Sequence, residues 1–430
     1  MLTRTTDFNR KICRHRQRGV ALPLVAIGLL AMLAVAGLAL DASHALTNKT
    51  RLQNTTDAAA LAAAKEYDLA NDIIAANAEA LSIFGINADG AGNHELNAAY
   101  DIGEITIRIE WSETLNPFIN TGVGPYVRVV ATDYDIDTSL SAVVGISEIG
   151  IGASAVAGPS PAIKRACNIA PLVACAKDPE DTNLFGFQPN QLEVLKAGSD
   201  PNCPADPENP EVGPGNFQLI RLDCGAGGKC VRENLAGTYD SCATIDQTVE
   251  TEPGNTVGPT VMGLNTRFGV YTGAMQGTEA LYPPDVVTAE PSSRLFYGKS
   301  DTSNECRIRR TDTQDLVTAE TIDFSWDDYL FNIQTAQLTN IPPAGEYERR
   351  VLTIPIARCD GEDNGQSTLD VVGFGCYFIL QTVEQAGNLA HIFGQFIEGC
   401  TANGTPGPDP MSGPDPYLIQ LYKDPDSGDS

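Results

Sequence analysis

The first clear pattern along the chain is a run of apolar residues close to its start. No charged side chain occurs between Val20 and Leu40, a stretch of 21 residues. A helix rises about 1.5 Å per residue, so a helix of this length crosses a hydrocarbon core of about 30 Å. Pro23 falls in the first turn, where a missing N–H does little harm. The pattern predicts a transmembrane helix over residues 20–40.

The next segment predicts that this helix continues beyond the apolar run. From Asp41 to about Phe84 the chain has no proline and is rich in alanine, a composition that favours helix. The larger apolar residues of this stretch would form part of the packed face of the helix. They are Leu46, Leu61, Leu69, Ile73 and Leu81.

After the helical stretch, apolar and polar residues alternate, which is typical of strands buried on one face. The apolar members lie in three groups: Ile105, Ile107, Ile109 and Trp111; Val127, Val129 and Ala131; and Ile149, Ile151, Ala153, Ala155 and Ala157. Residues 41–158 are therefore expected to form an α+β unit, a helix followed by a small antiparallel sheet. The Gly and Pro residues at 158–161 read as a linker.

Residues 159–430 are rich in turn residues and cysteine, and they predict a second, mainly β domain. Ten of the 11 cysteines fall here, and Cys13 lies near the start. An even number of cysteines outside the cytoplasm indicates disulfides, although spacing alone gives no pairing. A zinc cluster is the alternative, but no close CxxC pair is present. The disulfide candidates are Cys167, Cys175, Cys203, Cys224, Cys230, Cys242, Cys306, Cys359, Cys376 and Cys400.

The charge is divided unevenly along the chain. Residues 1–19 carry six Arg or Lys side chains against one Asp, a net charge of +5, so the rest must carry −32 to reach the total of −27. The positive-inside rule then predicts a single-pass protein of the bacterial inner membrane, with residues 1–19 as a basic cytoplasmic tail and the large part periplasmic or extracellular. The acidic balance argues against nucleic acid as a partner.

A cleaved signal peptide is the alternative interpretation of the same start. A basic segment before an apolar run is common to both classes, and Ala34-Val35-Ala36 resembles a small-residue cleavage site. The apolar run is longer than a usual signal core and leads without a helix breaker into further helix. We therefore expect a retained anchor.

Motifs that would indicate catalysis or a nucleotide cofactor do not occur: there is no HExxH, GxSxG, GxxxxGK or strand-following GxGxxG. The sequence therefore predicts neither an enzyme nor a bound cofactor. The best ligand candidate is the segment DGEDNG at 360–365, where Asp360, Glu362 and Asn364 alternate as in the first half of a calcium loop. Val371 stands where such a loop needs a bidentate Glu, so only the first half of the calcium-loop pattern is present.

The stretch from Arg16 to Lys65 resembles the N-terminal segment of TadG-like proteins of the Flp (tight adherence, Tad) pilus-assembly system. The residues that carry the resemblance are Arg18-Gly19 before the apolar run, Asp41 at its end, and Arg51-Leu52-Gln53-Asn54 followed by Asp57 and the alanine run. The resemblance implies a pilin-like helix and sheet over 41–158. It also implies a non-enzymatic, membrane-anchored role in pilus biogenesis and surface adhesion, with other Tad assembly proteins or pilins as partners.

Two family features are not found in this sequence. Related pseudopilins are cut after a Gly and carry Glu five residues later, but that position after Gly19 holds Leu24. Many TadG-like proteins carry a von Willebrand factor A domain with a DxSxS metal site, whereas the nearest segment here is Asp323-Phe324-Ser325-Trp326-Asp327. Neither pseudopilin processing nor that domain is predicted.

Two other functional classes remain open from sequence. The chain could be a surface adhesin or calcium-dependent binding module, in which residues 159–430 hold a ligand and the anchor only attaches them. An envelope hydrolase would need a catalytic group that the motifs do not reveal.

Overall fold

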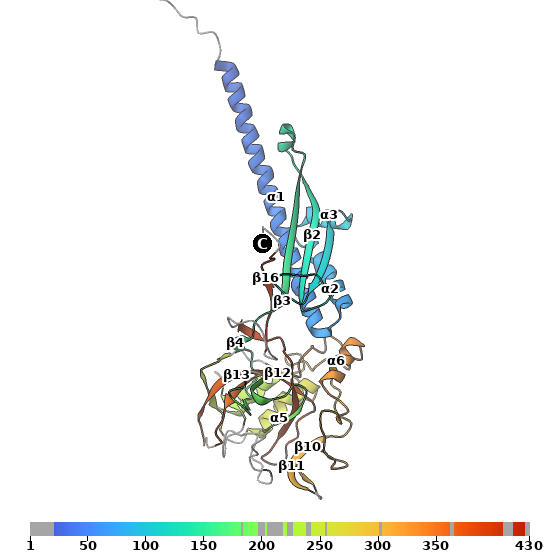
Figure 1. The fold of residues 1–430 in the computed structure, drawn as a ribbon, viewed down its shortest axis with the longest axis vertical. Coiled ribbons are helices and arrows are strands. Elements are labelled where there is room, and N and C mark those ends of the chain that lie inside the picture. The colour runs from blue at the N-terminus through green and yellow to red at the C-terminus, as the bar shows by residue number, and fades with distance from the viewer. Residues whose placement is uncertain are drawn as a thin grey trace, which may run out of the picture.

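In a computed structural model of the chain, two folded units lie along a long axis, and a single helix projects from one end (Figure 1). The structure describes residues 21–181, 184–196, 203, 218–221, 227–237, 242–253, 256–300, 303–361, 365–406 and 416–425. We call helices α1–α3 with strands β1–β3 and β16 the N-terminal unit. The described residues from 163 to 406 form the C-terminal unit.

Helix α1 (Ala21–Ala70) has 50 residues and is about 75 Å long at 1.5 Å per residue. The expectation of one helix to about Phe84 is wrong at its end, because the chain turns back at Asn71, which has a left-handed φ of 48°. Asp72 then caps α2 (Ile73–Ala88) by accepting hydrogen bonds from the N–H groups of Ile74 and Ala75. Asn tolerates the left-handed region and Asp is a preferred N-cap, so the break has a local cause.

The three predicted strands of the N-terminal unit are confirmed and form one antiparallel sheet with a fourth strand, in the order β1-β2-β3-β16. The short 3-10 helix η1 forms the tip of the β2–β3 hairpin, and α3 precedes β1. The bounds are α3 (His94–Asp101), β1 (Thr106–Ser112), β2 (Tyr126–Asp137), η1 (Ser141–Val144), β3 (Glu148–Pro159) and β16 (Ile419–Tyr422).

The packed face of the helical segment agrees only in part with the apolar residues predicted for it. Leu61 of α1 and Ile73 of α2 are partly buried against the core, whereas Leu46 of α1 and Leu81 of α2 are exposed, by 65% and 42% of their surface. Most of the buried apolar positions of α1, in the core that it shares with α2, β2 and β3, are alanines, because a side chain of one methyl group lets neighbouring elements lie close together. The residues of α1 that belong to this buried apolar cluster are Leu52, Ala59, Ala60, Ala63 and Ala64.

The C-terminal strand returns to the first unit, which the division at residue 158 did not anticipate. In β16, Ile419 pairs with Pro159 and Tyr422 with Val156, so this strand completes the edge of the N-terminal sheet beside β3. At residue 159 the chain passes with little slack from β3 into β4, which begins at Ile163. The two units are thus joined by two adjacent crossings of the chain.

The C-terminal unit is mainly β, as expected. Its largest sheet follows the order β5-β12-β13-β14-β6, with β9 pairing β13 and β7 pairing β9, and only the β5–β12 pair is parallel among the described strands of this sheet. A three-stranded sheet, β15-β4-β8, and the hairpin β10–β11 complete it. The bounds are β4 (Ile163–Cys167), β5 (Ala174–Cys175), β6 (Leu192–Lys196), β7 (Ile220–Arg221), β8 (Cys242–Thr244), β9 (Thr248–Thr251), β10 (Leu295–Ser300), β11 (Ser303–Arg310), β12 (Val351–Arg358), β13 (Thr368–Ile379), β14 (His391–Ile397) and β15 (Asn403–Pro406).

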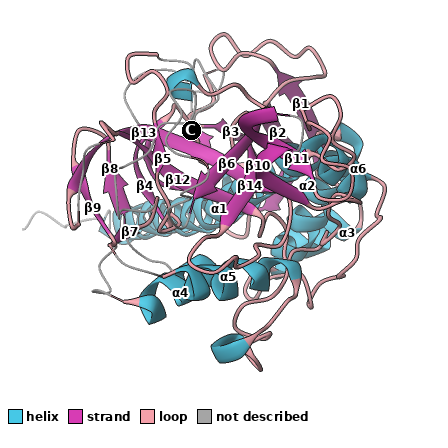
Figure 2. Ribbon diagram, turned by 90° about the horizontal axis from the view of Figure 1, so that it is seen from below, coloured by secondary structure: helices cyan, strands magenta, loops and turns pink. Residues whose placement is uncertain are grey.

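Two helices cover one side of this large sheet. Figure 2 shows α4 and α5 next to each other beside the strands. Leu235 of α4 and Leu264 of α5 are fully buried in one cluster with Ile354 of β12. The helices are α4 (Gly228–Ala236), α5 (Val257–Asn265) and α6 (Trp326–Gln334), with short 3-10 turns at η2 (Leu184–Gly186), η3 (Thr266–Phe268) and η4 (Gly273–Met275).

Disulfides link elements of the C-terminal unit. Four of them join described cysteines, Cys230 is also disulfide-bonded, and Cys224 lies outside the described residues. In the chain-entropy view, loops of these lengths contribute roughly 3 to 5 kcal/mol per bridge by restricting the unfolded chain. The pairs are Cys167–Cys242, Cys175–Cys359, Cys203–Cys306 and Cys376–Cys400, with sequence separations of 75, 184, 103 and 24.

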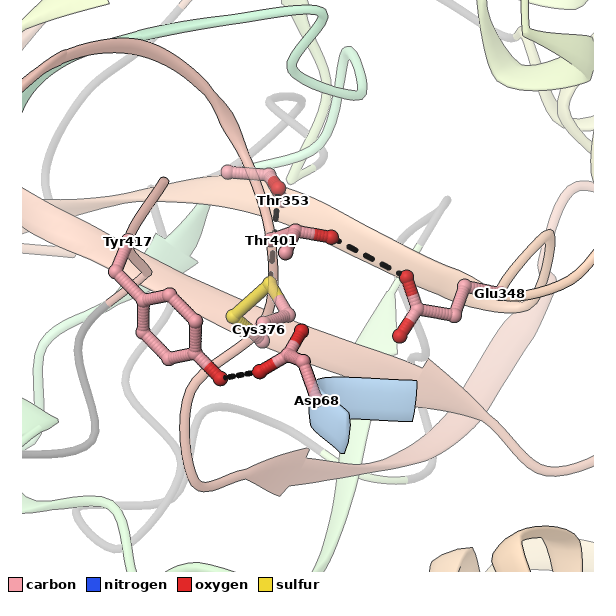
Figure 3. Close-up of a disulfide and its surroundings, with 7 residues drawn as sticks. Asp68, Glu348, Thr353, Cys376, Thr401 and Tyr417 are labelled. Carbon is pink, nitrogen blue, oxygen red and sulfur yellow. Dashed lines mark hydrogen bonds between the residues drawn. A yellow bond between two sulfur atoms is a disulfide. The ribbon is translucent and has the colours of Figure 1, made fainter. Parts of the chain in front are cut away.

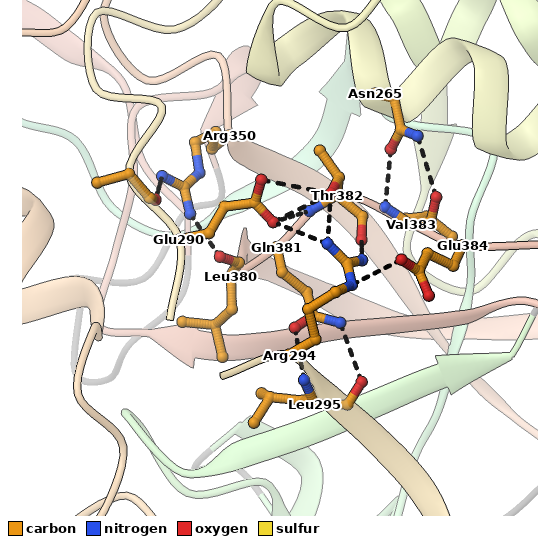
Figure 4. A network of polar contacts seen from close by, with 11 residues as sticks. Asn265, Glu290, Arg294, Leu295, Arg350, Leu380, Gln381, Thr382, Val383 and Glu384 are labelled. Atoms are coloured by element: carbon orange, nitrogen blue, oxygen red, sulfur yellow. Dashed lines mark hydrogen bonds and ion pairs between the residues drawn. The ribbon is translucent and has the colours of Figure 1, made fainter. Parts of the chain in front are cut away.

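Buried polar side chains fix the segment that follows β13 (Figure 4). Gln381 exchanges two hydrogen bonds with the backbone of Leu295, and Asn265 does the same with Val383. Arg350, fully buried, donates to four backbone carbonyl oxygens, including that of Leu380. Because buried polar groups are costly unless paired, these contacts specify one packing of the core.

Candidate functional site: the anchor helix and its two junctions

The first part of α1 exposes an apolar surface on all sides. In the described part of the chain, one helix is long and apolar enough to cross a membrane by length and composition. Its large apolar side chains between 23 and 40 are 42% to 75% exposed. Covering each would gain about 1.5 to 3 kcal/mol, so this surface is compatible with a single-pass membrane anchor. The exposed residues are Leu24, Val25, Ile27, Leu29, Leu30, Met32, Leu33, Val35, Leu38 and Leu40.

The upper junction lies where the apolar stretch ends. The carboxylate of Asp41, only 7% exposed, accepts hydrogen bonds from the N–H groups of Ser139 (3.2 Å), Leu140 (3.0 Å) and Ser141 (2.6 Å) at the tip of the β2–β3 hairpin. The bonds from Ser141, and then those from Ser139 and Leu140, lower the pKa of Asp41 to about 2. A Cβ on Gly37, one turn earlier, would come within 2.6 Å of the Cβ of Leu140. The hairpin tip is therefore locked against α1 by a charge and by close contact.

Further along α1, polar residues between 44 and 53 hydrogen-bond to α3 and to β3 of the same unit. Asn48, fully buried, donates to Glu95 of α3 (2.7 Å), and His44 hydrogen-bonds the same carboxylate (2.7 Å). Gln53 donates to the carbonyl oxygen of Ser154 in β3 (2.8 Å) and to Asp57 (2.7 Å). At least one residue that carries the sequence resemblance, Gln53, thus also connects the helix to the sheet.

The lower junction is formed where α1 meets the C-terminal unit (Figure 3). The hydroxyl of Tyr417 donates to the carboxylate of Asp68, and Thr401 donates to Glu348 (3.4 Å) beside the Cys376–Cys400 disulfide. Burial raises the pKa of Asp68 to about 6, against the lowering effect of the Tyr417 bond. Burial and then the charge of Asp68 raise the pKa of Glu348 to about 7. This pair can take up protons near neutral pH.

A cleft of about 500 Å³ lies at this junction. Tyr67 and Asp68 of α1 line one side, and Trp326 and Leu330 of α6 line the other. Gln334 at the end of α6 also lines this cleft and donates to the carbonyl oxygen of Ala70 at the end of α1 (2.6 Å), which joins the two helices.

The predicted calcium candidate is only partly within the described residues. Asp360 follows β12, whereas Glu362 and Asn364 lie outside the described residues. No group of three or more His, Cys, Asp or Glu side chains arranged to hold a metal occurs among the residues that the structure describes. Ser325, of the DxSxS-like segment, caps α6 in a capping box with Asp328.

Sequence reasoning did not find either junction. Asp41 was noted only as the end of the apolar run, and its partners lie about 100 residues away. Asp68 and Glu348 are far apart in sequence and belong to different units. Two signals in the sequence could have pointed to these junctions. Asp41 is an acidic residue directly after the apolar run, and Asp68 is an acidic residue within the alanine-rich helix.

One comparison with known proteins gives a match. The family described as "Putative Flp pilus-assembly TadE/G-like" (Tad) matches residues 19–66, which cover the exposed apolar part of α1, Asp41 and most of the helix that packs on the sheet. This confirms the resemblance of the N-terminal segment and supports involvement in Flp pilus assembly. No curated protein and no solved structure matches the chain.

Proposed function

We propose that this chain is a membrane-anchored, non-enzymatic component of Flp (Tad) pilus assembly, of the TadG-like kind, which supports pilus biogenesis and surface adhesion. The observation that carries the proposal is the continuity of α1. Its apolar part is exposed, its alanine-rich part packs on an antiparallel sheet, and the Tad match at 19–66 covers both. A helix of this kind can lie in a bilayer or pack against other helices in an assembly.

The proposed orientation follows from charge and cysteine chemistry. The tail of residues 1–19, with a net charge of +5, stays in the cytoplasm, and both folded units lie on the outer side of the bacterial inner membrane, in the periplasm or beyond. Disulfide-bonded cysteines in the C-terminal unit favour an oxidising compartment.

The proposed partners are other Tad assembly proteins or pilins, in addition to the membrane. The −32 charge of the remaining chain is unfavourable for nucleic acid. We assign no cofactor to this function, and a calcium ion at Asp360, Glu362 and Asn364 is not required by it.

The test is deletion of the gene from its host, followed by counting Flp pili and measuring attachment to a surface. Loss of both, restored by the full chain, is the expected result. A double variant L29R and L33R, which places charges in the exposed apolar part of α1, should not restore them, whereas the matched control L29I and L33I should. Unchanged pilus number and attachment after deletion would refute the role.

A further inference from the structure

The tip of the β2–β3 hairpin is unusual in composition for a turn between two polar strand ends. Residues 138–147, TSLSAVVGIS, contain no charged side chain, whereas Asp137 precedes them and Glu148 follows them. Leu140 and Ile146 are 47% and 43% exposed. Exposed turns in acidic proteins are usually polar, so a charge-free tip with exposed Leu and Ile calls for an apolar neighbour.

The position of this tip along α1 identifies that neighbour. Leu140 packs against Gly37: a Cβ added to Gly37 would lie only 2.6 Å from the Cβ of Leu140. Gly37 lies three residues inside the uncharged stretch that ends at Leu40, which places Leu140 about 4.5 Å within the segment that spans the membrane. Asp41, at the end of that stretch, accepts three hydrogen bonds from the same tip. The tip therefore lies alongside the membrane-exposed part of the helix.

The backbone of the tip is also suited to an apolar environment, where unpaired N–H groups are costly. The N–H groups of Ser139, Leu140 and Ser141 are bound by the Asp41 carboxylate. Gly145 and Ile146 donate to the carbonyl oxygens of Ala142 (3.1 Å) and Ser141 (3.2 Å). These bonds supply partners to the tip amides that water would otherwise satisfy.

We infer that the β2–β3 hairpin tip inserts into the outer surface of the lipid bilayer beside α1 and makes a second, non-spanning membrane contact. The inference rests on the membrane anchoring in the proposed function. The hydrocarbon and glycerol region of the outer leaflet covers Leu140 and Ile146, while Asp137 and Glu148 remain in water and limit the depth. With two contacts instead of one, any tilt of α1 that lifts the tip out of the bilayer is opposed, so the tilt of the N-terminal unit relative to the membrane is restricted.

The test uses the full chain reconstituted in phosphatidylcholine vesicles, with tryptophan as a reporter. Single variants L140W and I146W are compared with M32W, in the middle of the apolar stretch, and with I119W. Ile119 is 56% exposed and lies in the loop at the opposite end of the strands, about 36 Å along β2 from the tip. The quenchers are phosphatidylcholines brominated either near the headgroup end or near the far end of the acyl chains. The unsubstituted chain gives the background from Trp111 and Trp326.

The inference predicts that L140W and I146W lose emission mainly with the shallow bromines, that M32W loses it mainly with the deep bromines, and that I119W matches the background. Quenching of M32W without quenching of L140W or I146W would overturn the inference and leave the anchor intact. Absence of quenching at M32W would instead refute the anchor itself. The three atoms nearest to a Cβ on Gly37 all belong to Leu140, so I146W is the decisive variant if L140W disturbs the packing on the helix.

Discussion

Asp41 shows how one side chain joins the exposed apolar part of α1 to a folded unit. Its pKa of about 2 lies below the ordinary 3.8, so the folded state favours the carboxylate. The stabilisation is fully present above pH 4 and is lost as pH falls towards 2. D41N should loosen the hairpin tip at neutral pH, because an amide oxygen accepts more weakly than a carboxylate.

Amide hydrogen exchange at residues 139–141 measures this effect. Exchange should become faster in D41N, while the control D137N, which removes an exposed carboxylate from the same hairpin, should exchange like the parent chain. Equal protection in D41N and in the parent would contradict the role given to Asp41.

At the lower junction, stability should depend on pH in the opposite sense to that at Asp41, because the pKa values of Glu348 and Asp68 are raised rather than lowered. Their pKa values are raised to about 7 and about 6, so the folded state holds protons that the unfolded state has released. The stability due to those protons is complete below about pH 4 and is lost as pH rises through 7. E348Q should raise the stability at pH 8 by on the order of 2 kcal/mol and reduce the difference between pH 5 and pH 8.

Denaturant unfolding of the full chain in detergent at pH 5 and pH 8 tests this prediction. E346Q, which removes an exposed carboxylate two residues earlier, is the matched control against which the effect of E348Q is measured. If E348Q were less stable than the parent at pH 8, the carboxylate would be a net stabilising group and our account of the junction would be wrong.

At the scale of elements, most of the residues on the packed face of α1 are alanines. A60L should destabilise the N-terminal unit by about 1 to 3 kcal/mol, because Ala60 is fully buried in the core of this unit and a larger side chain would overpack it. L46A changes a residue that is 65% exposed and should cost about 0.5 kcal/mol or less. Thermal unfolding of both variants is the measurement, and a larger loss in L46A than in A60L would support the leucine face predicted from sequence.

The elements that sequence predicted well are those with a local signal. Alternation from Ile105 to Trp111 and from Ile149 to Ala157 gave the strands, because burial on one face imposes a period of two. The break at Asn71 was missed because alanine propensity on both sides outweighed a single Asn-Asp pair. The helix face was predicted only in part: Leu61 and Ile73 do pack against the core, but most of the fully buried positions of α1 are alanines, because close packing selects small side chains.

At the scale of the whole molecule, the two units are connected a second time by the C-terminal segment, which leaves the C-terminal unit and pairs with the N-terminal sheet as β16. Strand β16 covers the edge of β3, and Tyr417 beside it binds Asp68. Truncation after residue 415 should expose the β3 edge, increase aggregation and make the N-terminal unit sensitive to protease. A control truncated after Pro425 keeps the strand and should remain resistant. Equal resistance of the two truncations would show that β16 is dispensable.

Sequence could not reveal this tie, because strand pairing between residues 260 positions apart leaves no local pattern. The same holds for the pairing of cysteines. An even number of cysteines in a segment expected outside the cytoplasm indicated disulfides, but only the fold shows that Cys175 pairs with Cys359. The long apolar part of α1 could be predicted from sequence, because a run of this length without a charge is visible directly in the linear chain.

The most direct test of the central claim is the N-terminal sequence of the mature protein together with its retention in membranes after an alkaline carbonate wash. We predict an intact start at Met1 or Leu2 and full retention in the membrane pellet, since the apolar part of α1 remains in the bilayer. A start at Gly37 with the protein in the soluble fraction would contradict the account.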